Sequence, residues 1–426
     1  MMDLLIKGGK VIDPYNKFAK TSDILIKEGE IQAIEKGIEA DVPSYDATGK
    51  LVLPAFIDLH SHLREPGQEY KEDLTTGALA GLAGGFCALF AMPNTSPPLH
   101  SKSQIAYIFR KAENLPLYVF PIGALTLDMK GETLAPIGEL AEAGVKALSD
   151  DGMPIQNSGL LRNALLYAKM FGLIVMLHCE DKSLSERGVA NEGFTATRLG
   201  LRGMPKSAEE IGVARAIILS LATGCRVHIC HISTKNSLEL IRWGKKMGAP
   251  ITCEVTPHHL VLTEEALEGY DTRAKCNPPL RTEEDRKALI EGLLDGTIDC
   301  IATDHAPHSR EEWDVEFDLA PFGISGLETA FPLVYTKLVE EGGFPLDLLV
   351  EKLTFAPAKI IGLNLGSLKI GEEANLTIIG TEPLKVDVES FHSKGKNNPF
   401  DGWTLKGFPL LTICKGKTAY ERRNDL

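Results

Sequence analysis

The pattern of apolar and polar residues divides the chain into two β-rich ends and a longer middle. Short apolar segments, separated by Gly and charged turns, fill residues 1–50, and similar strand-turn-strand patterns return at residues 365–380 and 410–421. Both ends therefore differ from the middle in the same way. We predict that they form one small β domain, built from residues 1–53 and 365–426.

The middle alternates between apolar runs of strand length and stretches with a helical pattern. The predicted strands cover residues 51–60, 86–94, 117–125, 145–151, 173–180, 226–233, 251–259 and 298–305. The helical patterns that follow them include residues 101–114, 159–172, 207–224, 234–248 and 282–296. Near-continuous apolar strands that alternate with helices are typical of a parallel sheet covered on both faces. Eight such units predict an α/β fold of the (β/α)8 TIM-type barrel class over residues 54–364.

A doubly wound open sheet is the alternative arrangement for such a pattern. The nucleotide-binding versions of that sheet carry a GxGxxG or GxxxxGK(S/T) motif after the first strand. No such motif follows residues 51–60, so those versions lose support.

Composition and charge narrow the class of protein further. The 426 residues are 44% hydrophobic and 24% charged, which is ordinary for a globular protein. The net charge of −13 argues against nucleic acid and anionic membrane as partners, because both need a basic surface. The chain has no apolar run near the roughly 20 residues of a membrane span and no signal-peptide core. Its eight cysteines are scattered without a CxxC pair, which predicts reduced, mostly buried thiols in a cytoplasmic protein.

Candidate chemistry gathers where the predicted strands stop. Six of the eight strands end in polar side chains that can ligate a metal or bind substrate: His60 and His62, Asn94, Asp150 and Asp151, His178, His231, and Asp304. In a parallel barrel the carboxyl ends of all strands lie on one face, where active sites form. A lone histidine at a strand end is more often structural, and we assign His100, His228 and His392 to that group.

The His60–His62 pair is the stronger signal. Residues i and i+2 point to the same side of a strand, so both imidazoles can reach one metal ion. Together with further single histidines and a late aspartate, the set suits Zn²⁺ or a similar divalent metal. The same alternation places His228 on the face opposite His231 and makes Cys179 a packing residue. Only one of Asp150 and Asp151 can face inward, and spacing alone does not choose between them.

The residues around these strand ends form a series of motifs. They read HLREPGQEYKED, MPNTSPP, SDDGMPIQ, HCED, HISTKNSLEL, CEVTPHHLVLTEEAL, CNPPLRTEEDRKALIEGLLDGTIDCIATDHAPH and GISGLETAFPL. In content and order they resemble the dihydroorotase family of the longer bacterial class, within the amidohydrolase superfamily. The resemblance extends over nearly the whole chain, including a small second domain built from both ends.

This resemblance implies a binuclear zinc site. His60 and His62 would hold one Zn²⁺, and His178 and His231 the other. Asp151, chosen over Asp150 by the match, would bridge or bind the metals, and Asp304 would be both a ligand and the catalytic base. Many superfamily members use a carboxylated lysine at the fourth strand, but here Lys146 lies at the wrong end of that strand. This departure leaves open whether one or two metals stay bound.

The family's activity is the interconversion of N-carbamoyl-L-aspartate and L-dihydroorotate in pyrimidine biosynthesis. The resemblance implies substrate-binding roles for Arg64, Asn94, Asn277, His308, Phe322 and Gly323. Arg64 would bind the substrate carboxylate with help from Asn94 and His308, because a guanidinium matches a carboxylate with two parallel hydrogen bonds. The alternative for Arg64 is a surface ion pair with Glu65 or Glu69, but its position two residues after His62, on the same strand face, favours a functional role. The acidic stretch at 309–320 is either a lid or a solvated loop.

Two other functions compete with this one. A hydantoinase- or allantoinase-type cyclic amidase would share the metal site, but such enzymes do not generally need an arginine after H-x-H. A catalytically inactive assembly partner would have lost ligands, whereas all the expected ligands are present here. The family also implies a homodimer or a complex with aspartate transcarbamoylase, although the sequence has no interface signature.

Overall fold

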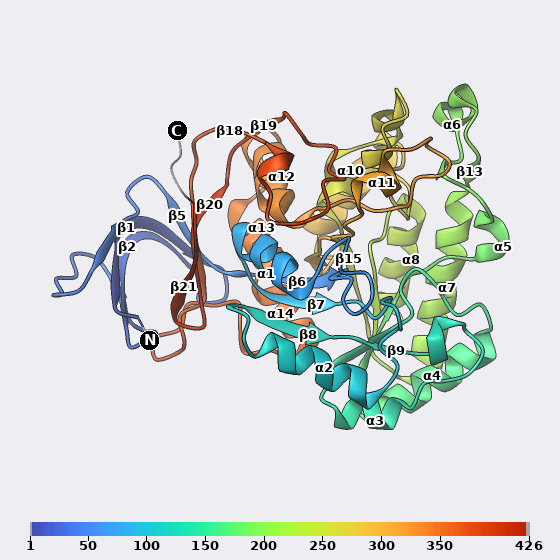
Figure 1. Cartoon of the computed structure of the whole chain (residues 1–426), viewed down its shortest axis with the longest axis horizontal. Coiled ribbons are helices and arrows are strands. Elements are labelled where there is room, and N and C mark those ends of the chain that lie inside the picture. The colour runs from blue at the N-terminus through green and yellow to red at the C-terminus, as the bar shows by residue number, and fades with distance from the viewer. Residues whose placement is uncertain (1, 423–426) are drawn as a thin grey trace.

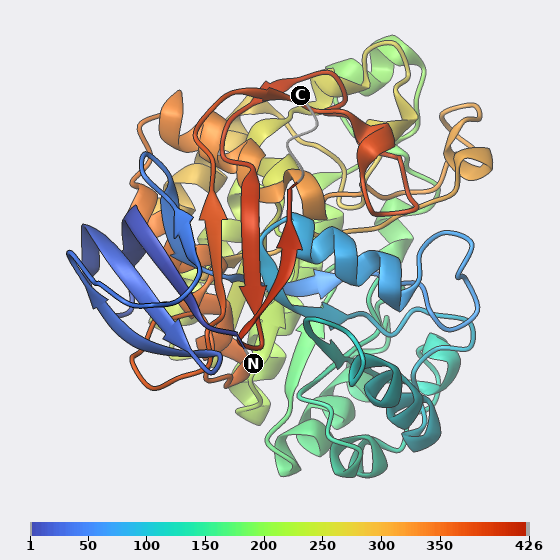
Figure 2. The same cartoon turned by 60° about the vertical axis from the view of Figure 1, so that its left-hand side comes forward.

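The computed structural model describes residues 2–422. Strands from both chain ends form one eight-stranded sheet on one side of the molecule (Figure 1). Its strands are β1 (Leu4–Asp13), β2 (Phe18–Lys27), β3 (Glu30–Glu35), β4 (Ser44–Asp46), β5 (Leu51–Pro54), β17 (Leu376–Ile379), β20 (Pro409–Cys414) and β21 (Lys417–Glu421). Strand β5 pairs with β1 in parallel and with β17 in antiparallel orientation, so it joins the two ends of the chain. Figure 2 shows the C-terminal strands, in red, beside the N-terminal strands, in blue.

Apolar side chains hold this sheet together. Ile6 and Ile24 pair across β1 and β2 and share a buried cluster with Val52 and Ile378. Burying aliphatic side chains of this size stabilises each by about 1.5–3 kcal/mol. The two chain ends therefore share one hydrophobic core, although they are far apart in the sequence.

The middle of the chain contains parallel strands, so the predicted α/β class is confirmed. One parallel sheet consists of β6 (Phe56–Ser61), β7 (Phe86–Ala91) and β8 (Tyr118–Pro121). A second consists of β9 (Gly123–Ala124), β10 (Ala147–Ser149), β11 (Ile174–Leu177), β14 (Val227–Ile229), β15 (Ile251–Val255) and β16 (Cys300–Ile301). Ile122 alone separates β8 from β9, and a parallel bridge joins Ser61 to His305, beyond β16.

Helices follow the strands and lie around them (Figure 1). The longer ones are α1 (Leu74–Ala83), α2 (Lys102–Ala112), α4 (Ser158–Met170), α7 (Lys206–Thr223), α8 (Lys235–Lys246), α10 (Glu283–Leu294) and α13 (Leu346–Leu353). The shorter ones are α3 (Ile137–Glu142), α5 (Lys182–Ser185), α6 (Phe194–Leu199), α9 (Pro257–Val261), α11 (Arg310–Trp313), α12 (Ala330–Val334) and α14 (Phe355–Ile361). Their starts are encoded locally. Ser101 accepts a hydrogen bond from the Gln104 backbone at the start of α2, and Thr234 caps α8 in the same way. The five helical patterns named from the sequence begin and end within two residues of α2, α4, α7, α8 and α10.

One segment of the C-terminal end does not stay with the terminal sheet. Between β17 and β20 the chain forms β18 (Leu384–Lys385) and β19 (Thr404–Leu405) and runs across the carboxyl ends of the parallel strands. Phe400 and Phe408 from this segment are buried in a cluster with Ile324 and Leu280. The short β patterns of the sequence did not predict this excursion, because its contacts are made with distant loops.

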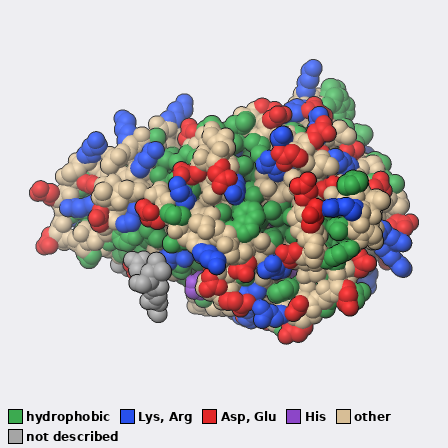
Figure 3. Space-filling view, turned by 90° about the horizontal axis from the view of Figure 1, so that it is seen from above, with side chains coloured by type: hydrophobic (Ala, Val, Ile, Leu, Met, Phe, Trp, Pro, Cys, Tyr) green, Lys and Arg blue, Asp and Glu red, His purple; other side chains and the backbone are tan. Residues whose placement is uncertain are grey.

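Acidic and basic side chains are interspersed on the face drawn in Figure 3, so neither sign of charge dominates that face. Within residues 2–422, no helix has the length and apolar character needed to cross a membrane. The short paired strands β12 (Ala190–Asn191) and β13 (Gly203–Met204) complete the set of strands within residues 2–422.

Candidate active site

The four predicted histidine ligands meet around one carboxylate, that of Asp151. Its Oδ2 lies 3.5 Å from the Nε2 atoms of both His60 and His62. Its Oδ1 lies 3.5 Å from His231 Nε2 and 3.8 Å from His178 Nδ1. The two oxygens of Asp151 therefore divide the histidines into two pairs, one pair facing each oxygen.

Asp304 belongs with the first pair. Its Oδ1 lies 3.0 Å from His62 Nε2 and 3.4 Å from His60 Nε2. Burial alone would raise the pKa of this carboxyl, but the neighbouring charge of His60 and the hydrogen bond with His62 bring it below its usual range. Asp304 is therefore ionised and can act as a ligand or accept a proton.

Three residues at the site have left-handed backbone conformations. The φ angles are 31° at His231, 48° at Asp304 and 61° at Arg64. A side chain with a Cβ adopts this region only at a cost in free energy, and such residues cluster at functional sites. Because the backbone turns at these residues, the alternation of side chains between the two faces of a strand stops there. Alternation therefore cannot predict whether a side chain beyond the end of a strand points inward or outward.

His228 is the clearest example of that effect. Alternation predicted that it faces away from the site, and this was wrong. Its Nε2 lies 3.0 Å from Glu254 Oε2, and the other oxygen of Glu254 lies 2.7 Å from His60 Nδ1. Strand β14 ends at Ile229, and the positive φ of His231 brings that residue toward the same network.

Acceptors outside the cluster orient the histidines. Glu254 accepts from His60 Nδ1. Burial raises the pKa of Glu254, but the charge of His60 and the hydrogen bonds with His228 and His60 lower it to about 2. Its position in the otherwise apolar strand β15 was a signal in the sequence that we did not use. If a bound cation displaced the proton of His60 Nε2, the bond from Nδ1 to Glu254 would leave the Nε2 lone pair directed toward Asp151.

The same arrangement holds for two more histidines. His62 Nδ1 lies 2.8 Å from Asn94 Oδ1, and His178 Nε2 lies 2.7 Å from Glu180 Oε2. Each pairing directs the opposite ring nitrogen toward the cluster. Asn94 was predicted to contact substrate, and it also holds His62. Glu180 was missed, although its place two residues after His178 could have suggested it.

The donor set fits a metal ion. His60 Nε2 and Asp151 Oδ1 are buried and have no hydrogen-bond partner within residues 2–422. Leaving such atoms unpaired costs about 1–3 kcal/mol each, so a cation that binds both would remove this cost. The ligand atoms of His60, His62 and Asp151, and those of Asp151, His178 and His231, each lie within 4.8 Å of one another. Imidazole and carboxylate groups in such sets suit divalent transition metals.

The neighbour of Asp151 has a different role. The carboxylate of Asp150 accepts hydrogen bonds from the backbone of Leu125 (2.8 Å) and Thr126 (3.2 Å) and from the Thr126 hydroxyl. Asp150 therefore fixes the loop after β9, and Asp151 is the residue that faces the histidines. Residue spacing did not show which of Asp150 and Asp151 faces inward, and these contacts show that Asp151 does.

A cavity of about 240 Å³ opens above the cluster. Its lining includes the predicted residues His62, Arg64, Asn94, Asp151, His178, His231, Asn277, Asp304, His308, Phe322 and Gly323, together with Gly152, Lys182 and Ala306. His60 lies fully buried beneath it. Every residue predicted for metal or substrate therefore belongs to one site.

Arg64 is buried in this cavity wall, at 8% exposure. Its Nε donates to the carbonyl of Pro307 (3.1 Å), and its Nη2 lies 3.4 Å from His308 Nε2. The alternative ion pairs are not made, because Glu65 pairs with Lys111 and Glu69 accepts from the Gly67 backbone. Burial lowers the pKa of Arg64 to about 10, so it remains a cation at neutral pH.

His308 is the neutral neighbour of that cation. Burial, then the charges of Arg64 and Lys71, lower the pKa of His308 to about 3. Its Nε2 lies 2.9 Å from the Phe322 carbonyl. Gly323 follows with a φ of 150°, and a Cβ there would lie 2.5 Å from the Ala306 carbonyl oxygen and 3.0 Å from His308 Nε2. The cavity wall therefore needs glycine at this position.

Glu180 also joins the opposite wall. Its Oε2 accepts from Asn277 Nδ2 (3.1 Å) and from Lys182 Nζ (2.7 Å). Lys182 was not predicted, and its spacing of four residues from His178 was the available signal. This wall thus carries a second cation that Glu180 partly neutralises.

The acidic stretch at 309–320 is tied down at several points. Glu312 pairs with Lys71 (2.8 Å), and Lys275 Nζ donates to the carbonyls of Phe317 and Ala320 at 2.6 Å each. These contacts attach the stretch to the cavity rim. Its function as a lid stays a prediction.

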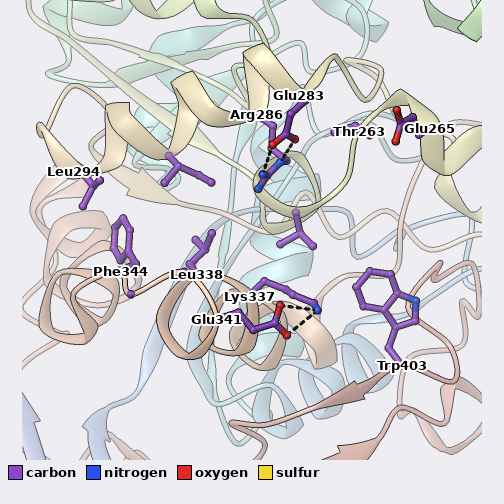
Figure 4. A pocket seen from close by; sticks show the side chains of 14 residues that line it. Thr263, Glu265, Glu283, Arg286, Leu294, Lys337, Leu338, Glu341, Phe344 and Trp403 are labelled. Carbon is purple, nitrogen blue, oxygen red and sulfur yellow. Dashed lines mark hydrogen bonds and ion pairs between the residues drawn. The ribbon is translucent and has the colours of Figure 1, made fainter.

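A larger cavity, of about 710 Å³, lies elsewhere, between α10 and the π-helical turn Tyr335–Glu340 (Figure 4). Its charged side chains pair with one another, Arg286 with Glu283 at 2.6 Å and Lys337 with Glu341 at 2.8 Å. Neither the unpaired buried atoms nor the histidines of the smaller cavity are found among its lining residues. Size alone therefore does not make it the candidate site.

Comparisons with known proteins agree with this geometry. The family described as Dihydro-orotase-like matches residues 49–237. A dihydroorotase of Thermoanaerobacter sp. is 50% identical over 99% of this chain and 98% of its own length, and one of Pelotomaculum thermopropionicum is 51% identical over 99% of both. Among solved structures, the L-hydantoinase (dihydropyrimidinase) of Arthrobacter aurescens superposes with a TM-score of 0.86 at 27% identity, covering 100% of this chain and 98% of that one.

Proposed function

Because the chain belongs to the dihydroorotase family, we propose that this site hydrolyses L-dihydroorotate to N-carbamoyl-L-aspartate and catalyses the reverse cyclisation. The observation that carries the proposal is the buried guanidinium of Arg64, which pairs with no carboxylate of residues 2–422 and lies in the same cavity as the histidine–aspartate cluster. A cyclic amide with a free carboxylate is the substrate that uses both features. Relatives that are half identical over their full length support the same activity.

Two zinc ions are the metals we propose for the cluster. The pairing of His60 with His62 on one oxygen of Asp151, and of His178 with His231 on the other, supports two positions with Asp151 between them. A divalent cation bound by these residues would supply a water with a pKa near 7 and would polarise the amide carbonyl. Asp304 would complete the position beside His60 and His62.

Asp304 is the proton carrier in this proposal. During hydrolysis its carboxylate takes the proton of the attacking water and delivers it to the amide nitrogen as the ring C–N bond breaks. The products are a carbamoyl NH2 group and a carboxylate, and the second proton of the water is released to solvent. In cyclisation the same carboxyl group moves the proton in the opposite direction.

The cavity walls would bind the rest of the substrate. Arg64 would bind the free carboxylate with its fork of N–H donors, and Asn94 and His308 flank that position. Asn277 would contact the ring amide, and the backbone at Phe322 and Gly323 would contribute further polar groups. Holding the ring at several points orients its carbonyl toward the cluster.

For the architecture we propose a closed (β/α)8 barrel over residues 54–364, with a small β domain from residues 1–53 and 365–426. Support comes from the parallel pairing within the sheet β6–β7–β8 and within the sheet β9–β10–β11–β14–β15–β16, from the single residue between β8 and β9, and from the bridge between Ser61 and His305. A homodimer and a complex with aspartate transcarbamoylase remain predictions from the family.

The first test is turnover by the purified, zinc-loaded protein. We expect hydrolysis of dihydroorotate at alkaline pH and cyclisation of N-carbamoyl-aspartate at acidic pH, both followed by ultraviolet absorbance. Hydantoin and allantoin serve as competing substrates for the related cyclic amidases. Cleavage of either, without turnover of dihydroorotate or N-carbamoyl-aspartate, would overturn the proposal.

Replacing Arg64 with methionine is expected to lower kcat/KM for dihydroorotate by about 30- to 4000-fold, or about 2–5 kcal/mol, because the substrate carboxylate then lacks its buried partner. The zinc content should equal that of the wild type, since Arg64 does not contact the cluster. Lys111→Met, which breaks a pair with Glu65 outside the cavity, is the matched control. A normal kcat/KM for Arg64→Met would show that another residue binds the carboxylate.

A further inference from the structure

A residue from the C-terminal segment, Asn397, is buried behind the substrate cavity at 1% exposure. Its Oδ1 accepts from the backbone N–H of His308 at 3.0 Å and from Ser325 Oγ at 3.2 Å. Its Nδ2 donates to the carbonyls of Ala306 at 3.0 Å and Gly323 at 2.8 Å. All four side-chain bonds thus go to the two loops that form one wall of the cavity.

These bonds surround the group that orients Arg64. Asn397 donates to the carbonyl of Ala306, the residue before Pro307, and accepts from the backbone N–H of His308, the residue after it. The Pro307 carbonyl between them accepts from Arg64 Nε. The direction of the guanidinium therefore depends on a peptide that Asn397 holds at both ends.

The segment around Asn397 is shaped to fit against this peptide. A Cβ on Gly395 would lie 2.4 Å from Pro307 Cβ and 2.5 Å from Ser325 Oγ, so this close approach requires glycine. Asn398 Nδ2 donates to the Ser325 carbonyl at 2.9 Å and to Thr329 Oγ1 at 3.0 Å. A few residues earlier, the Ser393 backbone donates to the buried carboxyl of Glu328 at 3.1 Å. Several independent contacts thus hold the segment in one position.

We propose that Asn397 is a positioning residue for substrate recognition, and that the C-terminal segment thereby sets the geometry of the carboxylate subsite. Asn397 does not reach the cavity itself; it acts through the Ala306–His308 peptides on Arg64 and His308, and through Gly323 on the facing loop. The inference rests on the proposed function, because it assigns Arg64 and His308 to the substrate carboxylate. It adds a residue about 90 positions away from that wall along the chain.

The test compares Asn397→Ala and Asn397→Asp with the wild type. The aspartate variant keeps the size and the acceptor, but it turns an oxygen toward the carbonyls of Ala306 and Gly323. We expect KM for dihydroorotate to rise about tenfold or more in both variants, with kcat within about threefold and zinc content unchanged. Asn375→Asp is the matched control, since Asn375 is also buried but bonds only to residues of the terminal sheet and its loops.

A double-mutant cycle separates positioning from a general loss of stability. If Asn397 acts through Arg64, then Asn397→Ala in the Arg64→Met background should lower kcat/KM by less than about twofold further. The inference would be overturned if the losses in kcat/KM of the two single variants multiplied fully in the double variant. It would also be overturned if Asn397→Ala lowered the melting temperature but left KM unchanged. If neither Asn397 variant folds, Ser325→Ala removes one of the four bonds and should raise KM in the same direction. A wild-type protein that does not turn over dihydroorotate would instead refute the proposed function.

Discussion

Asp151→Ala is expected to prevent binding of the proposed zinc ions and to abolish measurable turnover. Asp151 is the carboxylate that both histidine pairs face, and without it four imidazoles would surround the cations with less negative charge to offset them. Changing a residue outside the ligand shell costs about 10- to 100-fold in metal affinity, and loss of a shared ligand should cost more than about 100-fold. Zinc content after gel filtration, and competition with a chromogenic chelator, measure this loss.

The adjacent Asp150 provides the control for that experiment. Asp150→Ala removes the acceptor of the Leu125 and Thr126 N–H groups, so we expect a lower melting temperature. Its zinc content should remain that of the wild type, because Asp150 faces away from the histidines. If Asp150→Ala lost zinc while Asp151→Ala kept it, the assignment of the two aspartates would be reversed.

Asp304→Asn is expected to lower kcat by about 1000-fold or more in both directions. The amide is nearly the same size but cannot carry the proton between water and the amide nitrogen, and general acid–base catalysis alone contributes about 10²- to 10⁴-fold. The loss of an anionic ligand beside His60 and His62 adds to the effect. Steady-state rates with dihydroorotate and with N-carbamoyl-aspartate, normalised to zinc content, measure it.

Both directions should lose the same factor in kcat/KM, because an enzyme variant cannot change the equilibrium between substrate and product. Asp58→Asn is the matched control. Asp58 is buried below the site, and its carboxylate accepts from the backbone and hydroxyl of Thr303, at 2.8 and 2.7 Å, and from the backbone N–H of His60 at 3.5 Å, so its bonds go to no imidazole of residues 2–422. We expect less than about a tenfold loss for it. An active, zinc-loaded Asp304→Asn enzyme would show that another group moves the proton.

Arg64 lies in the cavity wall for a different reason from the one that the sequence suggested. The sequence predicted a functional Arg64 because it follows His62 by two residues on the same strand face. Strand β6 ends at Ser61, and Arg64 has a φ of 61°, so strand alternation does not reach it. Its side chain nevertheless enters the cavity, because the turn after the strand directs it to Pro307 and His308.

The sequence by itself determined the α/β class, five of the longer helices and the gathering of candidate ligands at strand ends. Those properties depend on local regularities: period two in strands, capping residues such as Ser101, and the rule that parallel strands share one carboxyl end. The family motifs added the choice of Asp151 and the likeness to dihydroorotases. Tertiary structure decided what surrounds the ligands. His60 and Glu254 lie 194 positions apart, and Asn397 lies 89 positions from His308. No local pattern marks such pairs, because their contact depends on how the strands and the returning C-terminal segment pack together in space.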